Sequence, residues 1–212
     1  MAFGKHWEWR GFGALSTGLR TRVESLPLKF DRPQDVKDEY LWIPGMSINV
    51  KLRFTDLKFK RLLGSEQGVE RWLEDEAENL PFPLEPPVVE KLSRELGVSL
   101  PRLLERSYGQ EELVDLLLRA KPPVRRIAVE KKRWQREWMT PEARASGAGP
   151  VTVEIAEILS PEATVSVGLE HPEPGPVAAA RDDLGLGTAM KRLNYLEALS
   201  VWARRERIGN RE

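Results

Sequence analysis

The stretch Ile48-Asn49-Val50-Lys51-Leu52-Arg53-Phe54, followed by Thr55-Asp56 and then Leu57-Lys58-Phe59-Lys60, decides the fold of this chain. Apolar side chains alternate with polar or basic ones in both halves, and successive side chains of a β-strand point to opposite faces of its sheet. Thr55-Asp56 has the composition of a tight turn. The pattern therefore predicts a β-hairpin with one apolar and one basic face, the basic face being formed by Lys51, Arg53, Lys58 and Lys60.

The N-terminal segment His6-Trp7-Glu8-Trp9-Arg10 alternates in the same way. His6, Glu8 and Arg10 share one side, and the two tryptophans share the other. We therefore expect a strand with one polar and one aromatic face.

Three later stretches also have the alternation of strands. Val124 to Trp138 places Lys131 and Arg133 on one side. The next two predicted strands place Glu154 and Glu170 opposite their apolar residues. Their bounds are Val151 to Ala156 and Ala163 to Glu170.

Helical patterns lie between and after these strands. The middle of the chain is expected to hold a helical insert at about residues 66–121, which includes the acidic segment Gly68 to Leu80 and an apolar pattern over Gln110 to Ala120. A C-terminal helix is expected from Thr188, which suits an N-cap, to about Arg205.

The repeated alternation predicts an α+β protein built on an antiparallel β-barrel, with helices packed outside and a polar interior. Each charged face, taken alone, fits a hairpin that turns this face to water. Several such faces biased to Lys and Arg favour the barrel, whose converging cations repel one another unless an anion is bound. We expect a single domain over residues 1–212 that binds a triphosphate or polyphosphate-type small molecule.

The composition excludes several functions. The 212 residues contain 33 Lys and Arg and 33 Asp and Glu, and this net charge of zero argues against nucleic-acid binding. The absence of Cys excludes disulfides and thiolate chemistry. No apolar stretch reaches the roughly 20 residues that span a bilayer, and the charged, aromatic N-terminus does not resemble a signal peptide. A cytoplasmic location is expected, and the oligomeric state is left open.

Five stretches, in this order, resemble the CYTH superfamily, the triphosphate tunnel enzymes that include class IV adenylyl cyclases, thiamine triphosphatases and inorganic triphosphatases. The segment His6 to Arg10 resembles the Glu-x-Glu-x-Lys signature of the first strand, with His6 replacing the first glutamate and Arg10 the lysine. The other stretches are Asp38 to Trp42 with Asn49 to Arg53, Lys58 to Lys60, Val129 to Trp134, and Leu184 to Gly187 with Asn194-Tyr195.

The resemblance implies roles for individual residues. Glu8 and Arg10 are the implied catalytic residues, and Mg or Mn is the implied cofactor. The phosphates are expected to contact Lys51, Arg53, Lys58, Lys60, Lys131 and Arg133. The metal is expected to contact Glu8, Glu154 and Glu170. The family's last strand usually offers Glu-x-Glu, whereas Gly168 precedes Glu170 here, and fewer oxygen ligands weaken a magnesium site.

Three functions fit these observations. The first is metal-dependent hydrolysis of inorganic, nucleoside or thiamine triphosphate, of which cyclase activity is a variant that the sequence does not separate. The second is a catalytically weakened relative that binds polyphosphate, a nucleotide or another phosphorylated ligand. The third is a non-enzymatic interaction barrel without a phosphate ligand, which the neutral net charge favours.

Overall fold

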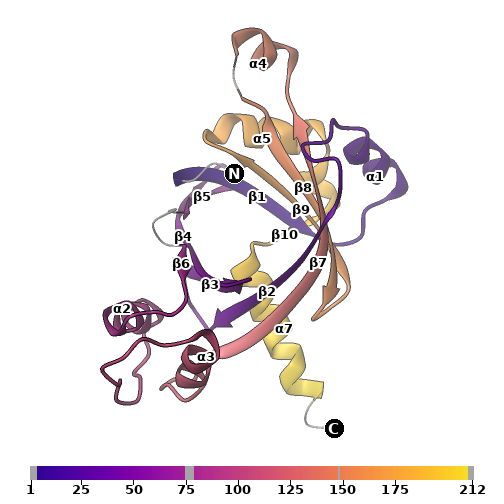
Figure 1. Ribbon diagram of the computed structural model, residues 1–212. Helices are drawn as coiled ribbons and strands as arrows, with labels where there is room; N and C mark the ends of the chain where they lie inside the picture. Colours follow the sequence, from indigo (N-terminus) through magenta and orange to yellow (C-terminus); the bar gives the residue numbers. More distant parts are fainter. Residues whose placement is uncertain (1–3, 75–78, 148, 210–212) are drawn as a thin grey trace.

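The computed structural model describes residues 4–74, 79–147 and 149–209 and has a closed antiparallel β-barrel of eight strands (Figure 1). The strands follow the order β1-β5-β4-β3-β2-β7-β8-β9 around the barrel, and β9 pairs with β1 to close it. The predicted fold class and barrel are confirmed. The barrel strands are β1 (Gly4–Phe12), β2 (Gln34–Trp42), β3 (Ile48–Arg53), β4 (Asp56–Glu66), β5 (Val69–Glu74), β7 (Arg125–Trp138), β8 (Val151–Ser160) and β9 (Thr164–His171). The short strands β6 (Leu80–Pro81) and β10 (Lys191–Arg192) pair with β4 and β1.

Strands β3 and β4 form the predicted hairpin, but its turn lies one residue earlier than expected. The turn is Phe54-Thr55, and Asp56 already belongs to β4. Phe54 is 83% exposed and has a positive φ of 54°, so it is not part of the apolar face. Leu57 and Phe59 are buried outside the barrel, as the alternation predicts.

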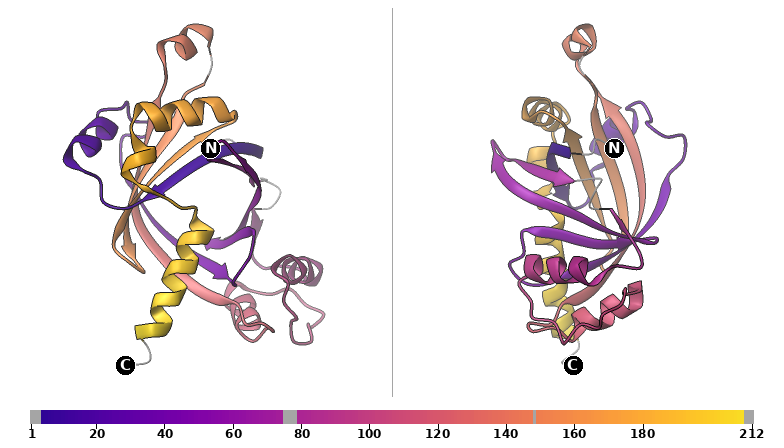
Figure 2. Two further views of the ribbon diagram at one scale, coloured as in Figure 1. Left: turned by 180° about the vertical axis from the view of Figure 1, so that it is seen from behind. Right: turned by 60° about the vertical axis from the view of Figure 1, so that its left-hand side comes forward.

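Helices cover the outside of the barrel, except α4, which stands away from it at the tip of the connection between β7 and β8 (Figures 1 and 2). Those in the described residues are α1 (Thr17–Glu24), α2 (Pro86–Leu96), α3 (Gln110–Leu118), α4 (Pro141–Ser146), α5 (Pro174–Asp183), α6 (Leu186–Ala189) and α7 (Tyr195–Gly209). One apolar cluster joins α2 and α3 to the β3–β4 hairpin and includes Leu57, Leu92 and Leu113. A second joins α1, α5 and α6 to β1, β8 and β9, where Trp9 and Leu169 face outward.

Helix α7 closes one end of the barrel. Tyr195 stacks on Tyr40 at 5.6 Å between ring centroids and meets Phe12 edge-on at the same separation. Trp202, further along α7, packs edge-on against Phe12 at 6.0 Å. Because Phe12 and Tyr40 point inward, this cluster forms an apolar plug, and the polar part of the interior lies beyond it.

The helical insert begins later than predicted. Glu66, where the predicted insert starts, is the last residue of β4, the acidic segment contains strand β5, and residues 75–78 lie outside the described residues. Strand β5 pairs with β1 on one side and β4 on the other, so it is needed to close the barrel. The first helix of the insert is α2, which begins at Pro86.

The C-terminal helix is also different from the prediction. Thr188 belongs to the short helix α6, and α7 begins only at Tyr195. Asn194 caps α7, since its Oδ1 accepts from the backbone N–H of Glu197 at 2.9 Å and its own N–H donates to Glu197 Oε2 at 2.8 Å. This reciprocal pair is a capping box, so the N-cap lies six residues beyond Thr188. No helix in the described ranges is long and apolar enough to cross a bilayer.

The outer core can be tested on two adjacent leucines of α3. Leu117 is fully buried in the cluster beneath α2 and α3, whereas Leu118 is 43% exposed. Leu117→Ala is expected to lower the free energy of unfolding by about 2–5 kcal/mol, because it leaves a cavity. Leu118→Ala is the matched control and should change it by less than about 0.5 kcal/mol. Equal effects in urea denaturation would contradict this packing.

Candidate functional site

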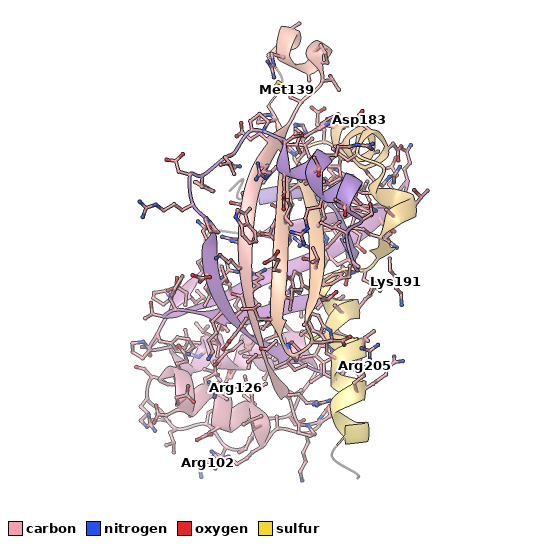
Figure 3. The ribbon with its side chains drawn as sticks, turned by 90° about the vertical axis from the view of Figure 1, so that its right-hand side faces the viewer. Arg102, Arg126, Met139, Asp183, Lys191 and Arg205 are labelled. Carbon is pink, nitrogen blue, oxygen red and sulfur yellow. The ribbon has the colours of Figure 1, made fainter. Side chains whose placement is uncertain are left out.

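The polar part of the barrel interior holds a cavity of about 60 Å³. A buried water needs roughly 10–15 Å³ of such volume, so the cavity has room for a few waters before any side chain moves. Side chains from all the barrel strands and from α7 line it: Glu8, Arg10, Tyr40, Asn49, Lys51, Arg53, Lys60, Trp72, Glu74, Lys131, Arg133, Gln135, Glu154, Glu170 and Tyr195. Other basic residues lie on the outer surface, among them Arg102, Arg126 and Lys191 (Figure 3).

Glu154 lies at the centre of the largest charge cluster. Its Oε1 accepts from Arg10 at 3.1 Å and its Oε2 from Arg133 at 3.1 Å. Lys131 Nζ is 3.9 Å from Glu154 Oε1 and donates to the Tyr195 hydroxyl at 3.0 Å. Burial alone would raise the pKa of Glu154, but the three cations outweigh it and hold this pKa well below its usual range. Glu154 is therefore ionised and neutralises part of the basic interior.

Asp38 and Arg53 form a bidentate buried pair. Arg53 Nε donates to Asp38 Oδ1 at 2.5 Å, and a terminal nitrogen of Arg53 donates to Oδ2 at 2.6 Å. Asp38 has no exposed surface, and burial alone would raise its pKa. The nearby charges of Lys51, Arg53 and Lys131 instead hold this pKa well below its usual range. The pair links β2 to β3 across the inside of the barrel.

Glu8 is held between two cations. Its Oε1 accepts from Arg10 Nε at 2.8 Å, and its Oε2 accepts from Lys60 Nζ. Burial opposes ionisation, but Lys60 and Arg10 together lower the pKa of Glu8 to about 2. A Cβ at position 168 would lie 2.5 Å from an Arg10 nitrogen, so Gly168 is required for this position of the guanidinium.

Lys51 differs from the other cations of the cavity. Within the described residues it has no carboxylate within ion-pair distance, whereas Arg10, Arg53, Lys60, Lys131 and Arg133 each have at least one. Burial, followed by the charge of Arg53, lowers the pKa of Lys51 to about 7. Asn49 lies on the same face of β3 and is 5% exposed, and its Oδ1 has no hydrogen-bond partner in the described part of the chain. Unsatisfied polar groups of this kind mark a place where a ligand or water completes the site.

A second feature lies beside the cavity. One ring nitrogen of His6 and one oxygen each of Glu8 and Glu170 lie within 4.8 Å of one another. His6 is 4% exposed, and its Nε2 is buried without a hydrogen-bond partner among the described residues. Two carboxylates and a free imidazole nitrogen form a donor set that suits a divalent metal ion. We call these three residues the His6–Glu8–Glu170 cluster.

The structure brings most of the predicted site residues together. Nine of the ten line the cavity: Glu8, Arg10, Lys51, Arg53, Lys60, Lys131, Arg133, Glu154 and Glu170. In the mid-chain strand, Lys131 is buried inside while Lys132 contacts the Trp134 ring, so the predicted parity is confirmed. Lys58 is on the inward face of β4 but is not among the residues that line the cavity. Glu154 lies among cations and not in the His6–Glu8–Glu170 cluster.

Several lining residues were not singled out in the sequence. Asn49 precedes Lys51 by two residues, so the alternation of a strand predicts that both lie on the same face of β3. Trp72 and Glu74 lie in β5, which the sequence analysis treated as helical. Asp38 does not line the cavity, and its role is found only by knowing that β2 and β3 are neighbours, which places it beside Arg53.

The cavity keeps an excess of positive charge. Six Lys and Arg side chains and four glutamates line it. Asp38, which is not one of the lining residues, compensates the charge of Arg53. The chemistry of such an interior suits a small anion, and the adjacent carboxylates and imidazole are of the residue types that bind metal cations.

Comparisons with known proteins give similarity to solved structures alone. No family model matches the sequence, and no curated protein matches it. A conserved hypothetical protein from Pyrococcus furiosus is 16% identical over 91% of this chain and 98% of its own, with a TM-score of 0.49. A protein from Pyrococcus horikoshii is 16% identical over 90% and 98%, with a TM-score of 0.45. A protein described as a "putative adenylate cyclase" from Bacillus halodurans is 10% identical over 91% and 95%, with a TM-score of 0.40. No residue role is transferred from these proteins.

The Asp38–Arg53 pair gives a stability prediction. Asp38→Asn is expected to lower the free energy of unfolding by about 3–5 kcal/mol at neutral pH, because it leaves the Arg53 charge uncompensated. Since the pKa of Asp38 is lower in the folded state, its contribution is present above the unfolded carboxyl pKa of about 3.9 and is lost as the pH falls below it. Urea denaturation at several pH values measures both effects.

The matched control is Glu112→Gln, which breaks the exposed pair between Arg106 and Glu112. Exposed pairs contribute about 0–1 kcal/mol, so this variant should remain close to the wild type. An Asp38→Asn variant as stable as Glu112→Gln would show that the buried pair does not hold β2 to β3.

Proposed function

We propose that the barrel binds the phosphate groups of a triphosphate-type small molecule and hydrolyses it with the help of a divalent metal ion. The observation that carries this proposal is the position of the His6–Glu8–Glu170 cluster beside the basic cavity, since Glu8 and Glu170 belong to both. Phosphoryl transfer requires cations around the phosphate oxygens and a positioned nucleophile. The cavity supplies the cations, and a metal ion at the cluster would supply an activated water as the nucleophile. The resemblance to the triphosphate tunnel enzymes supports the same conclusion.

The basic residues divide into two groups in this proposal. Lys51 is free to bind phosphate directly because it has no carboxylate partner within the described ranges. Arg10 and Arg133 are fixed by Glu154, so they provide preorganised N–H donors around the anion. Lys58, outside the lining of the cavity, has no assigned contact with phosphate.

The donor set fits a divalent metal ion. The buried, unpartnered Nε2 of His6 is the structural observation that supports this fit. When bound, the metal would polarise the phosphoryl oxygens and lower the pKa of a water molecule. Imidazole nitrogen is an ordinary ligand for Mn-type and later transition metals, whereas Mg prefers oxygen ligands. Of the two expected metals, the cluster therefore favours Mn.

One observation favours the second function, in which the barrel binds a phosphorylated ligand without hydrolysing it. Both oxygens of Glu8 already accept hydrogen bonds from Arg10 and Lys60. If these bonds persist when the anion binds, Glu8 is not available to a metal ion. The barrel would then bind phosphate through its cations alone.

Thermal melting with tripolyphosphate tests binding. At a tripolyphosphate concentration 100 times its dissociation constant, the free energy of unfolding of the wild-type protein is expected to increase by about 2.7 kcal/mol. This increase raises Tm by several degrees. Lys51→Met should lose most of this increase and remain folded. Lys132→Met is the matched control, because Lys132 lies on the outer face of β7 and should leave the increase unchanged.

Phosphate release with and without Mn²⁺ then separates the functions. Metal-dependent release supports hydrolysis, whereas a Tm increase without release in any metal supports binding alone. If Tm does not change in any condition, both phosphate functions are wrong and the interaction barrel remains. Arg53→Ala is unsuitable as the binding test, because it would leave Asp38 buried without its partner.

Lys51 also makes anion binding depend on pH. Its folded-state pKa of about 7 means that it loses its proton above pH 7 in the free protein. The charged groups that act on it are Arg53, Asp38, Glu74 and Lys131. An anion favours the charged form, so affinity should fall by up to about tenfold per pH unit above 7. Calorimetry with sulfate, whose charge is constant in this range, should show proton uptake on binding. Lys51→Arg should bind with no such pH dependence, since arginine stays charged, and a wild type that behaves like this variant would contradict the assignment.

A further inference from the structure

Lys60 occupies the space between the two carboxylates of the His6–Glu8–Glu170 cluster. Its Nζ donates to Glu8 Oε2 and lies 4.0 Å from Glu170 Oε1. The Arg10 guanidinium is 3.9 Å from the same Glu170 oxygen. In the described residues the cluster is therefore neutralised by side chains of the protein itself, and Lys60 is the cation placed between its carboxylates.

We propose that Lys60 is a displaceable internal cation: a divalent metal ion that binds the His6–Glu8–Glu170 cluster releases the Lys60 ammonium from Glu8, and the released ammonium becomes a ligand of the anion in the cavity. This inference rests on the metal site of the proposed function. It adds a coupling between metal binding and anion binding that does not require the two ligands to touch.

The first step follows from charge and geometry. A metal ion held by Glu8 and Glu170 would lie close to the Lys60 ammonium, and positive charges so close together repel each other strongly in a site removed from water. The dication attracts Glu8 and Glu170 more strongly than the single charge of Lys60. His6 adds a nitrogen lone pair, since its buried Nε2 accepts no hydrogen bond from Lys60 or from any other group among the described residues. The metal therefore gains a ligand where the lysine has none.

The second step follows from the position of Lys60. Its side chain lines the cavity and is 14% exposed, and its Nζ lies 5.3 Å from the centre of the Trp72 ring. The four-carbon stem of lysine is flexible, so the ammonium can turn from Glu8 toward the cavity while the stem stays in place. There it would join Lys51 as a cation without a carboxylate partner. Arg10 is less able to move, because Glu154 and Gly168 fix its guanidinium.

The coupling must act in both directions. A metal ion that releases Lys60 increases anion affinity, and an anion that attracts Lys60 increases metal affinity by the same factor. Couplings of this kind typically amount to about 5–150-fold.

Mn²⁺ binding to the metal-free protein tests the proposal without any measurement of activity. Free Mn²⁺ is followed by electron paramagnetic resonance, with and without sulfate, which binds Mn²⁺ weakly in solution. Lys60→Met keeps the apolar stem and removes the competing charge. We expect it to bind Mn²⁺ about tenfold tighter than the wild type without sulfate, within the range of such couplings. Sulfate should tighten Mn²⁺ binding at least about fivefold in the wild type and much less in Lys60→Met.

Lys58→Met is the matched control, since Lys58 lies on the same face of β4 without lining the cavity, and it should behave as the wild type. Adding His6→Gln to Lys60→Met should reverse the gain in Mn²⁺ affinity, which shows that the gain belongs to this cluster. Equal Mn²⁺ affinity of the wild type and Lys60→Met, equal effects of sulfate on both, or no Mn²⁺ binding to either would each overturn the inference. The predicted coupling together with no phosphate release would support it and reject hydrolysis.

Discussion

The interior of this barrel depends on the neutralisation of charges that are removed from water. A charged side chain without a partner inside a protein costs several kcal/mol, so most of the inward basic residues are met by carboxylates, and the pKa of the exception, Lys51, is lowered to about 7. Glu154 meets Arg10 and Arg133, Asp38 meets Arg53, and Glu8 meets Arg10 and Lys60. Each of these contacts joins residues on different strands, except that between Glu8 and Arg10 on β1. The contacts of Glu154 with Arg133 and of Asp38 with Arg53 join neighbouring strands, whereas those of Glu154 with Arg10 and of Glu8 with Lys60 reach across one intervening strand. The ion pairs therefore connect the strands across the interior and determine which charges remain in the cavity.

The apolar side chains are arranged as this charged interior requires. Because the inside is polar, the strands must bury their apolar faces outward, and the helices supply the second layer of two separate clusters. The third cluster lies inside at one end, where Tyr195 of α7 packs against Phe12 and Tyr40. The Tyr195 hydroxyl also accepts a hydrogen bond from Lys131. Tyr195 therefore lies at the boundary between the apolar plug and the charged cavity.

The sequence predicts the barrel and most of the inward-facing residues because the two-residue period of a strand assigns each side chain to a face. It does not predict how the charges pair. The neutralising role of Asp38 depends on the neighbourhood of β2 and β3, which no local pattern encodes. Strand β5 was missed because its acidic sequence has a weak alternation and is stabilised by pairing with β1 and β4. The cap at Asn194 was missed because Thr188, in the preceding short helix, offers the same type of side chain.

The presence of His6 in the first strand and Gly168 in the last strand has a consequence for the metal-free barrel. A glutamate at position 6 or 168 would add negative charge beside Glu8 and Glu170, where Lys60 and Arg10 are already shared between the two. His6 offers a donor without a charge, and Gly168 leaves room for the Arg10 guanidinium. The cluster can therefore be balanced by the protein's own cations when no metal is present. The same balance opposes a metal ion, since any dication must compete with Lys60, and a bound anion that attracts Lys60 away removes that competition.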